Sequence, residues 1–217
     1  MAPATSRKPI PLPRIDPLHQ GALDGLCGIY AIINSVRLLC READRKFCSS
    51  LFRLLLRTLK GQVRRHIAIV WRGIRPRILL ALIYRCIAYI RMRLRIKLTA
   101  RRLPKALRKS GSLVKIWHGL NKVVGPNRVA ILSIEGIISH WTVAYAVTPK
   151  TIRLFDSDGQ RALLRSSCAI ASTRKRFQLD PRGVVFIERK KTKARDQATH
   201  ARPPQPRSPS CNSMMRK

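Results

Sequence analysis

Apolar positions divide the chain into a helical part followed by a strand-rich part. Within residues 27–40, Ile29, Ile33 and Val36 recur at the three- and four-residue spacing of one helical face. The run follows Gly25 and precedes charged residues. The pattern therefore predicts a buried helix over residues 27–40.

Residues 47–109 alternate arginine with leucine and isoleucine at helical spacing, which predicts two or three basic amphipathic helices. Two glycines and two prolines break the pattern: Gly61, Gly73, Pro76 and Pro104. The most apolar run, residues 79–90, contains Arg85 and falls short of the roughly 20 residues that span a bilayer. We therefore expect a core helix there and no membrane span.

Beyond these helices the pattern changes to short β-branched and aromatic runs separated by Gly, Pro, Asp and Asn. The runs fall at residues 129–133, 138–147, 151–155 and 184–188. Such runs are typical of antiparallel strands. A helical front followed by a β-rich back predicts an α+β fold, in one domain over residues 18–189. Residues 1–17, with five prolines, predict an extended arm, and residues 190–217 predict a disordered basic tail.

The charge is distributed unevenly along the chain. There are 45 Lys and Arg against 10 Asp and Glu, for a net charge of +35. No acidic residue occurs in residues 45–128, here called the basic middle region. Such a field attracts polyanions, although it also fits an arginine-rich helical surface exposed to solvent. We expect weak, non-specific polyanion binding and, on charge alone, an acidic peptide or protein as substrate.

The six cysteines are scattered, without a C-x-x-C pair or a histidine spacing suited to zinc. We therefore expect no structural metal, no cofactor and no disulfide scaffold. The first residues lack the apolar core of a signal peptide, which predicts a cytoplasmic protein unless a specialised secretion system exports it.

The segment LDGLCGIYAIIN places Cys27 in the first turn of the predicted helix. A helix N-terminus carries partial positive charge, which favours a thiolate over a thiol. The glycines on either side, Gly25 and Gly28, would let a substrate backbone approach closely. A buried structural cysteine is the alternative, because free cysteine packs as a small hydrophobe.

A histidine and two aspartates follow in the strand-rich part. His140 lies inside a predicted strand, and Asp156 follows it by 16 residues, after the turn signal at residues 148–150. The two are therefore expected to be neighbours on a hairpin, where the carboxylate could hold the imidazole tautomer. Asp158 is the alternative carboxylate, although its place before Gly159 suits a turn cap.

These segments together resemble the papain-like cysteine peptidase superfamily, in which a cysteine at a helix start precedes a histidine and an aspartate or asparagine on a following sheet. The likeness is closest to the peptidase domains that cleave bacteriocin leader peptides. It implies a papain-like fold and a triad of Cys27, His140 and Asp156. It also assigns an oxyanion-hole donor to Gln20, seven residues before Cys27 and one residue further than is common.

The resemblance implies nucleophilic acyl transfer. Cys27 would attack a carbonyl, His140 would protonate the leaving group, and water or another acceptor would resolve the thioester. A thiol peptidase or amide hydrolase is the first expectation, while deamidation and amine acyl transfer share the same first half. Two alternatives from other classes stay open: a basic protein that binds nucleic acid or an anionic surface, and a papain-fold pseudoenzyme.

Overall fold

Helices occupy the first half of the described chain and a sheet most of the second. The computed structural model describes residues 15–21, 25–62, 73–136, 139–170 and 175–190. Residues 1–14 of the expected arm and residues 191–217 of the expected tail lie outside these ranges. The elements are α1 (Cys27–Leu39), α2 (Arg45–Gln62), α4 (Pro76–Leu94), β1 (Leu98–Arg102), α5 (Lys105–Lys109), α6 (Leu113–Val123), β2 (Arg128–Gly136), β3 (His140–Val147), β4 (Thr151–Leu154), β5 (Ala162–Leu164), the 3₁₀ turn η1 (Arg165–Ser167), β6 (Cys168–Ala169) and β7 (Phe177–Arg189).

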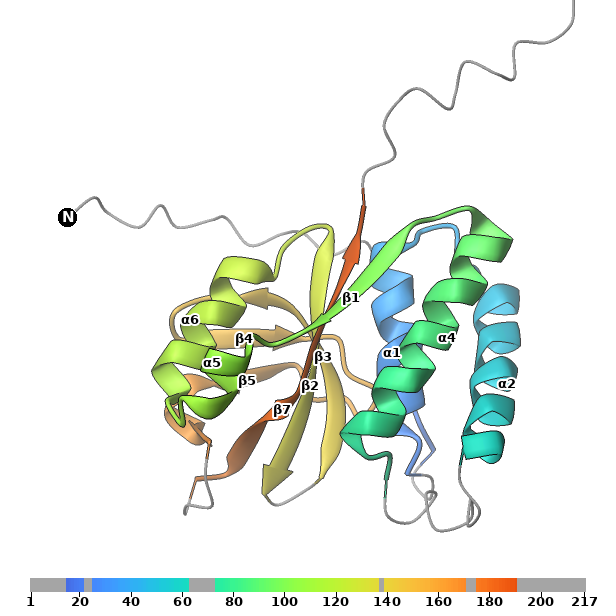
Figure 1. Ribbon diagram of the computed structural model, residues 1–217. Coiled ribbons are helices and arrows are strands. Elements are labelled where there is room, and N and C mark those ends of the chain that lie inside the picture. The colour runs from blue at the N-terminus through green and yellow to red at the C-terminus, as the bar shows by residue number, and fades with distance from the viewer. Residues whose placement is uncertain (1–14, 22–24, 63–72, 137–138, 171–174, 191–217) are drawn as a thin grey trace, which may run out of the picture.

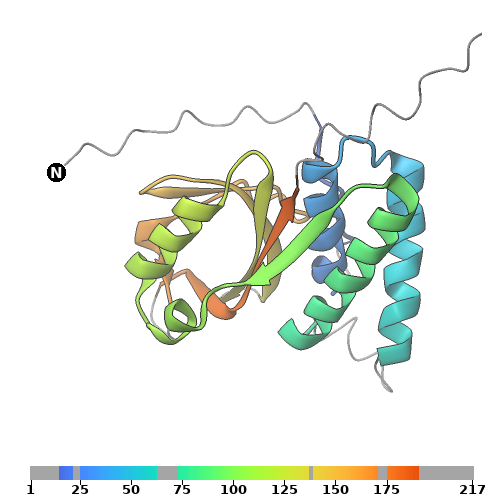
Figure 2. The same ribbon diagram turned by 45° about the horizontal axis from the view of Figure 1, so that its top comes forward.

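The strands of the described residues form one seven-stranded sheet in the order β1-β7-β2-β3-β4-β5. Neighbours in this order are antiparallel, and the short β6 pairs with β7 in parallel. Helices α1, α2 and α4 cover one side of the sheet, while α5 and α6 lie on the other (Figure 1). The turned view in Figure 2 keeps this arrangement. The expected α+β class is therefore confirmed.

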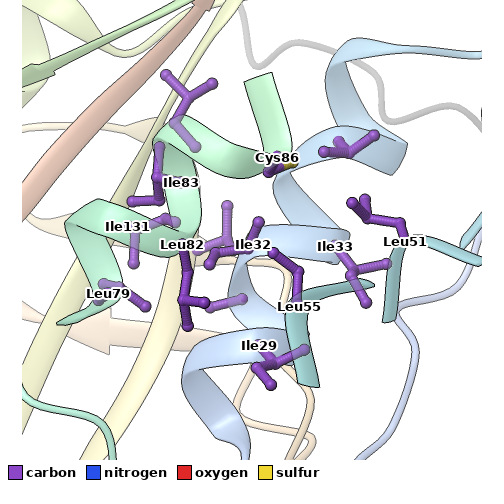
Figure 3. Packing of buried hydrophobic residues seen from close by; sticks show 14 of the residues in the cluster. Ile29, Ile32, Ile33, Leu51, Leu55, Leu79, Leu82, Ile83, Cys86 and Ile131 are labelled. Atoms are coloured by element: carbon purple, nitrogen blue, oxygen red, sulfur yellow. The ribbon is translucent and has the colours of Figure 1, made fainter. Parts of the chain in front are cut away.

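Successive residues of the strands pack alternately into two hydrophobic clusters, one on each face of the sheet. Ile131 of β2 packs with Ile32 of α1 and Leu82 of α4, in the cluster of the three long helices (Figure 3). The next residue, Leu132, belongs to the cluster that contains Trp117 of α6 on the opposite face. Burying a leucine or isoleucine side chain stabilises the fold by about 1.5–3 kcal/mol relative to leaving it exposed. The sheet is thus held by apolar packing on both faces.

The structure confirms the helices expected from the apolar spacing. Helix α1 matches the prediction over residues 27–40, and α2 and α4 match the expected basic amphipathic helices. Helix α4 packs into the core through residues such as Leu79 and Ile83, whereas Arg85 is exposed. None of the helices in the described ranges is long and apolar enough to cross a membrane.

The basic middle region is not helical throughout, and in this respect the expectation is wrong. Residues Leu98–Arg102 form strand β1, which pairs with β7 from Leu98 opposite Arg189 to Arg102 opposite Val185. Helix α4 ends at Leu94, before this strand, because Arg95 adopts a left-handed conformation with φ of 58°. The partner strand lies about 90 residues away along the chain, so local spacing does not reveal the pairing.

Candidate active site

Cys27 is the first residue of α1 and lies at the edge of a cleft. Its side chain is buried, with 5% of the residue exposed. The residue before it, Leu26, gives α1 no side-chain cap, and no acidic residue occurs in the first turn. The first N–H groups of a helix lack intrahelical partners and carry partial positive charge. The helix therefore presents polar donors at the same point as the thiol.

His140 begins strand β3 and lies between Cys27 and Asp156. Its Nε2 is 2.8 Å from Oδ2 of Asp156, and both side chains are almost completely buried. Cys27 lies close enough to the imidazole to help raise its pKa. The three residues singled out from the sequence are thus brought together as a connected series.

Electrostatics favours the charged forms of the histidine and the aspartate. Burial lowers the pKa of His140, but hydrogen bonds to Asp156 and Cys27, together with their charges, outweigh it and raise the pKa to about 10. Burial raises the pKa of Asp156, but the hydrogen bond and charge of His140 outweigh it and hold this pKa below its usual value. A buried imidazolium is therefore stable next to an anionic partner.

The choice between the two candidate carboxylates falls on Asp156. Its Oδ1 accepts hydrogen bonds from the backbone N–H groups of Asp158, at 2.8 Å, and Gln160, at 3.2 Å. Its other oxygen is thereby aimed at His140. The side chain of Asp158 is exposed, and Gly159 after it has a φ of 83°, as a turn requires. Asp158 thus lies exposed in the turn, and Asp156 faces the imidazole.

A β-bulge in β3 determines which residues face one another on the β3–β4 hairpin. Near the turn, Val147 pairs with Ile152, whereas further along Ala144 pairs with Leu154. Strand β3 therefore uses one residue more than β4, and Tyr145 is the extra residue. All four paired residues belong to the same hydrophobic cluster, so they share one face.

The bulge puts His140 and Asp156 on the same face. Because side chains alternate along a strand, His140 shares the face of Ala144, and Asp156 shares the face of Leu154. Without Tyr145 as an extra residue, the alternation of β3 would be reversed and His140 would point away from Asp156. The contact across this hairpin thus depends on one inserted residue.

Gln20, expected as an oxyanion-hole donor, lies next to the loop of Asp156. Its backbone N–H donates to the carbonyl of Ser157 at 3.1 Å, and the Ser157 hydroxyl donates to its Oε1 at 3.4 Å. The segment is anchored nearby, since Asn34 of α1 accepts from the N–H of Leu18 and donates to its carbonyl. Within the described residues, Gln20 bonds to Ser157 and makes no recorded contact with Cys27.

A cleft of about 740 Å³ opens beside Cys27. Its walls come from the start of α4, the end of β1, the end of β2 and the irregular part of β7. Trp141 forms part of the lining, and its Nε1 donates to the carbonyl of Ile74 at 2.7 Å. This bond ties the segment before α4 to β3, and so fixes one wall of the cleft relative to the histidine.

Gly28 and Gly183 allow close packing within the protein itself. A Cβ on Gly28 would lie 3.1 Å from side-chain atoms of both Ile74 and Leu79. The expectation that Gly28 makes room for a substrate backbone is therefore wrong, because α4 and the segment before it occupy that space. A Cβ on Gly183 would lie 2.4 Å from that of Ser133, so β7 approaches β2 closely at the cleft.

Some residues of the site were not found from the sequence. Ser157, Asn34 and the Ile74 carbonyl position the site through long-range hydrogen bonds. Asn34 could have been noticed in the sequence, because it is a polar amide within an apolar helix. In the structure it is fully buried. Among the described residues, no group of three or more His, Cys, Asp or Glu side chains is arranged to hold a metal ion.

Comparison with known proteins adds no family assignment. No protein-family model matches the chain, and no curated protein or solved structure matches it significantly.

Proposed function

We propose that the protein is a papain-like cysteine-nucleophile enzyme that cleaves amide bonds, most simply as a thiol peptidase. The observation that carries the proposal is the series Cys27, His140 and Asp156, in which Nε2 of the histidine is 2.8 Å from the carboxylate and Cys27 is near enough to raise the pKa of the imidazole. The series supports the roles of nucleophile for Cys27, base for His140 and orienting group for Asp156.

The first half-reaction follows from these positions. The Cys27 thiolate attacks the carbonyl carbon and forms a tetrahedral oxyanion. As this collapses, the C–N bond breaks, and the imidazolium of His140 gives its proton to the leaving amine. The thioester then remains on Cys27. Asp156 stays ionised, holds the imidazole in orientation and stabilises its protonated form.

Water completes the reaction. Neutral His140 takes a proton from the attacking water, the new C–O bond forms and the C–S bond breaks. The products are a carboxylic acid and the regenerated thiolate–imidazolium pair. If an amine replaces water, the same step gives acyl transfer, and if the substrate is a glutamine side chain, the first step releases ammonia.

The oxyanion would be stabilised at the start of α1. The backbone N–H of Cys27 is one donor, at a helix terminus without a side-chain cap. Gln20 is the proposed second donor, because Ser157 holds its amide oxygen and leaves Nε2 for the substrate. Losing one such donor typically costs about 10²–10³ in rate.

The test is a peptide library incubated with the full chain and searched by mass spectrometry for new termini, deamidated glutamines and transfer products. We expect cleaved peptides with the wild-type protein and none with Cys27→Ala. His140→Ala should be as inactive, and the double variant little worse, since the two residues act as a unit. Identical product lists for the wild type and Cys27→Ala would contradict the proposal.

A second candidate function, polyanion binding, is favoured by exposed arginines on α2 and α4. They include Arg53 and Arg57 on α2 and Arg85 and Arg93 on α4. Retention on heparin should then fall steeply as salt rises, because phosphate or sulfate contacts release counterions. Retention that does not depend on salt would exclude this function.

A further inference from the structure

The cleft beside Cys27 carries more positive than negative charge. Arg182 is neutralised locally, because its Nε donates to Oδ1 of Asp180 at 3.0 Å. The other cationic residues of the lining are Arg75, Arg77 and Arg102. Within the described residues, no ion pair is recorded for these three.

One acidic residue of the lining remains to oppose them. Glu135 is exposed at the end of β2, where its Oε1 accepts a long hydrogen bond of 3.5 Å from the Ser133 hydroxyl. Arg182 and Asp180 neutralise each other. The remaining lining therefore contains three arginines and one carboxylate, that of Glu135. The cleft thus keeps an excess of positive charge next to the nucleophile.

Two helices also direct their positive ends at the cleft. Cys27 is the first residue of α1 and Pro76 the first of α4, and both line the cleft. Each helix N-terminus is equivalent to about half a positive charge, and neither first turn contains an acid that would cancel it. The field of the backbone therefore adds to that of the arginines.

We propose that the cleft selects an acidic peptide, one with carboxylate side chains close to the carbonyl that Cys27 attacks. This inference rests on the proposed function and names its substrate class. Arg75 and Arg77 at the start of α4, and Arg102 at the end of β1, bind the carboxylates, while Trp141 and Ile74 contact apolar parts of the peptide. The same arginines repel peptides rich in Lys or Arg.

The local field at Cys27 can be measured with two alkylating agents that differ in charge, iodoacetate and iodoacetamide. Both transfer a two-carbon group to the thiolate and release iodide, so the ratio of their rates isolates the electrostatic effect. In the full chain at an ionic strength of about 0.15 M, where the screening length is about 8 Å, we expect the double variant Arg77→Gln/Arg102→Gln to lower the iodoacetate-to-iodoacetamide ratio by about two- to fivefold.

The matched control is Arg91→Gln, which removes an exposed arginine of the same helix. Arg91 lies about 21 Å along α4 from Arg77, beyond the reach of screened charge. This variant should keep the wild-type ratio. Equal ratios in the wild type, the double variant and the control would overturn the inference while leaving the proposed function intact. Failure of Cys27 to react with either agent would overturn both.

Protection by ligands then identifies the class of anion. A glutamate-rich peptide should slow the reaction of Cys27 with iodoacetamide, and slow it more than its glutamine-rich counterpart does. It should also protect better than a single-stranded oligonucleotide of equal charge, and the double variant should lose this advantage. Stronger protection by the oligonucleotide would overturn the peptide assignment and point to nucleic acid in the cleft.

Discussion

Nε2 of His140 lies 2.8 Å from Oδ2 of Asp156, inside the protein and across a hairpin that contains a β-bulge. This contact occupies one ring nitrogen of the imidazole, Nε2, and leaves the other, Nδ1, available to Cys27. It also makes the charges of the two residues depend on each other, because burial alone would favour the neutral form of both.

The two aspartates near the turn should respond differently to substitution. Asp156→Asn keeps the shape but removes the charge that stabilises the imidazolium, so we expect amide cleavage to fall by about 10²–10⁴. Asp158→Asn is the matched control, since only its backbone N–H contacts Asp156. Its rate should stay within about twofold of the wild type. A sensitive Asp158 and a tolerant Asp156 would reassign the third residue of the triad.

The stability of the fold should depend on the close approach of β7 to β2. Gly183→Ala would place a Cβ 2.4 Å from that of Ser133, with the ring of Trp141 also in contact. We expect a loss of about 1–3 kcal/mol in the free energy of unfolding, measured by urea denaturation. Gly61→Ala, on the exposed side of α2 with nothing near its Cβ, should instead gain about 0.5–1 kcal/mol. Equal effects of the two substitutions would contradict the packing described for the cleft wall.

The ion pair of His140 and Asp156 should make stability depend on pH with a defined sign. The pKa of His140 is raised from 6.5 to about 10 in the folded state, so its contribution is complete below about pH 6.5 and is lost as the pH rises to about 10. The pKa of Asp156 is lowered, so its contribution is present above the unfolded pKa of 3.8 and is lost as the pH falls below it.

This dependence can be isolated with a variant. The difference in unfolding free energy between the wild type and His140→Gln should be largest between about pH 4 and 6.5 and should shrink toward about pH 10. Subtracting the variant removes the titration of other groups, such as the buried cysteines. A difference that is constant over this range would contradict the ion pair.

Much of the site could be predicted from the sequence because its signals are local. The helix that starts at Cys27 follows from apolar spacing, and the hairpin of His140 and Asp156 follows from a turn signal between two β-rich runs. The choice of Asp156 over Asp158 follows from turn chemistry at Gly159. Each of these features is set by residues within 16 positions of one another along the chain.

The parts that were missed depend on contacts between distant segments. Strand β1 is rich in arginine and becomes a strand only because β7 pairs with it. No sequence pattern indicates the bulge at Tyr145, although the bulge determines on which face of the sheet His140 lies. The cleft arginines come from the start of α4 and the end of β1, which only the folded chain brings beside Cys27. Register and tertiary approach, rather than propensity, control these features.

The other described cysteines provide internal references for the nucleophile. Burial raises the pKa of Cys40 to about 12 and that of Cys168 to about 11. Burial also raises the pKa of Cys48 and Cys86. Their thiolates are therefore scarce near neutral pH, and packing shields them. Cys27, by contrast, lies near His140 and helps to raise the pKa of that imidazole.

The most direct test is the rate at which iodoacetamide modifies each cysteine of the native protein as a function of pH, followed by peptide mapping. We predict that Cys27 reacts first, because His140 lies beside it as a candidate base while burial raises the pKa of the other described cysteines. In His140→Ala, checked for folding by circular dichroism, the rate at Cys27 near neutral pH should fall, because the imidazole proposed to activate the thiol is absent. A wild-type rate profile in folded His140→Ala, or reaction of Cys40 and Cys86 before Cys27, would contradict the proposed catalytic pair.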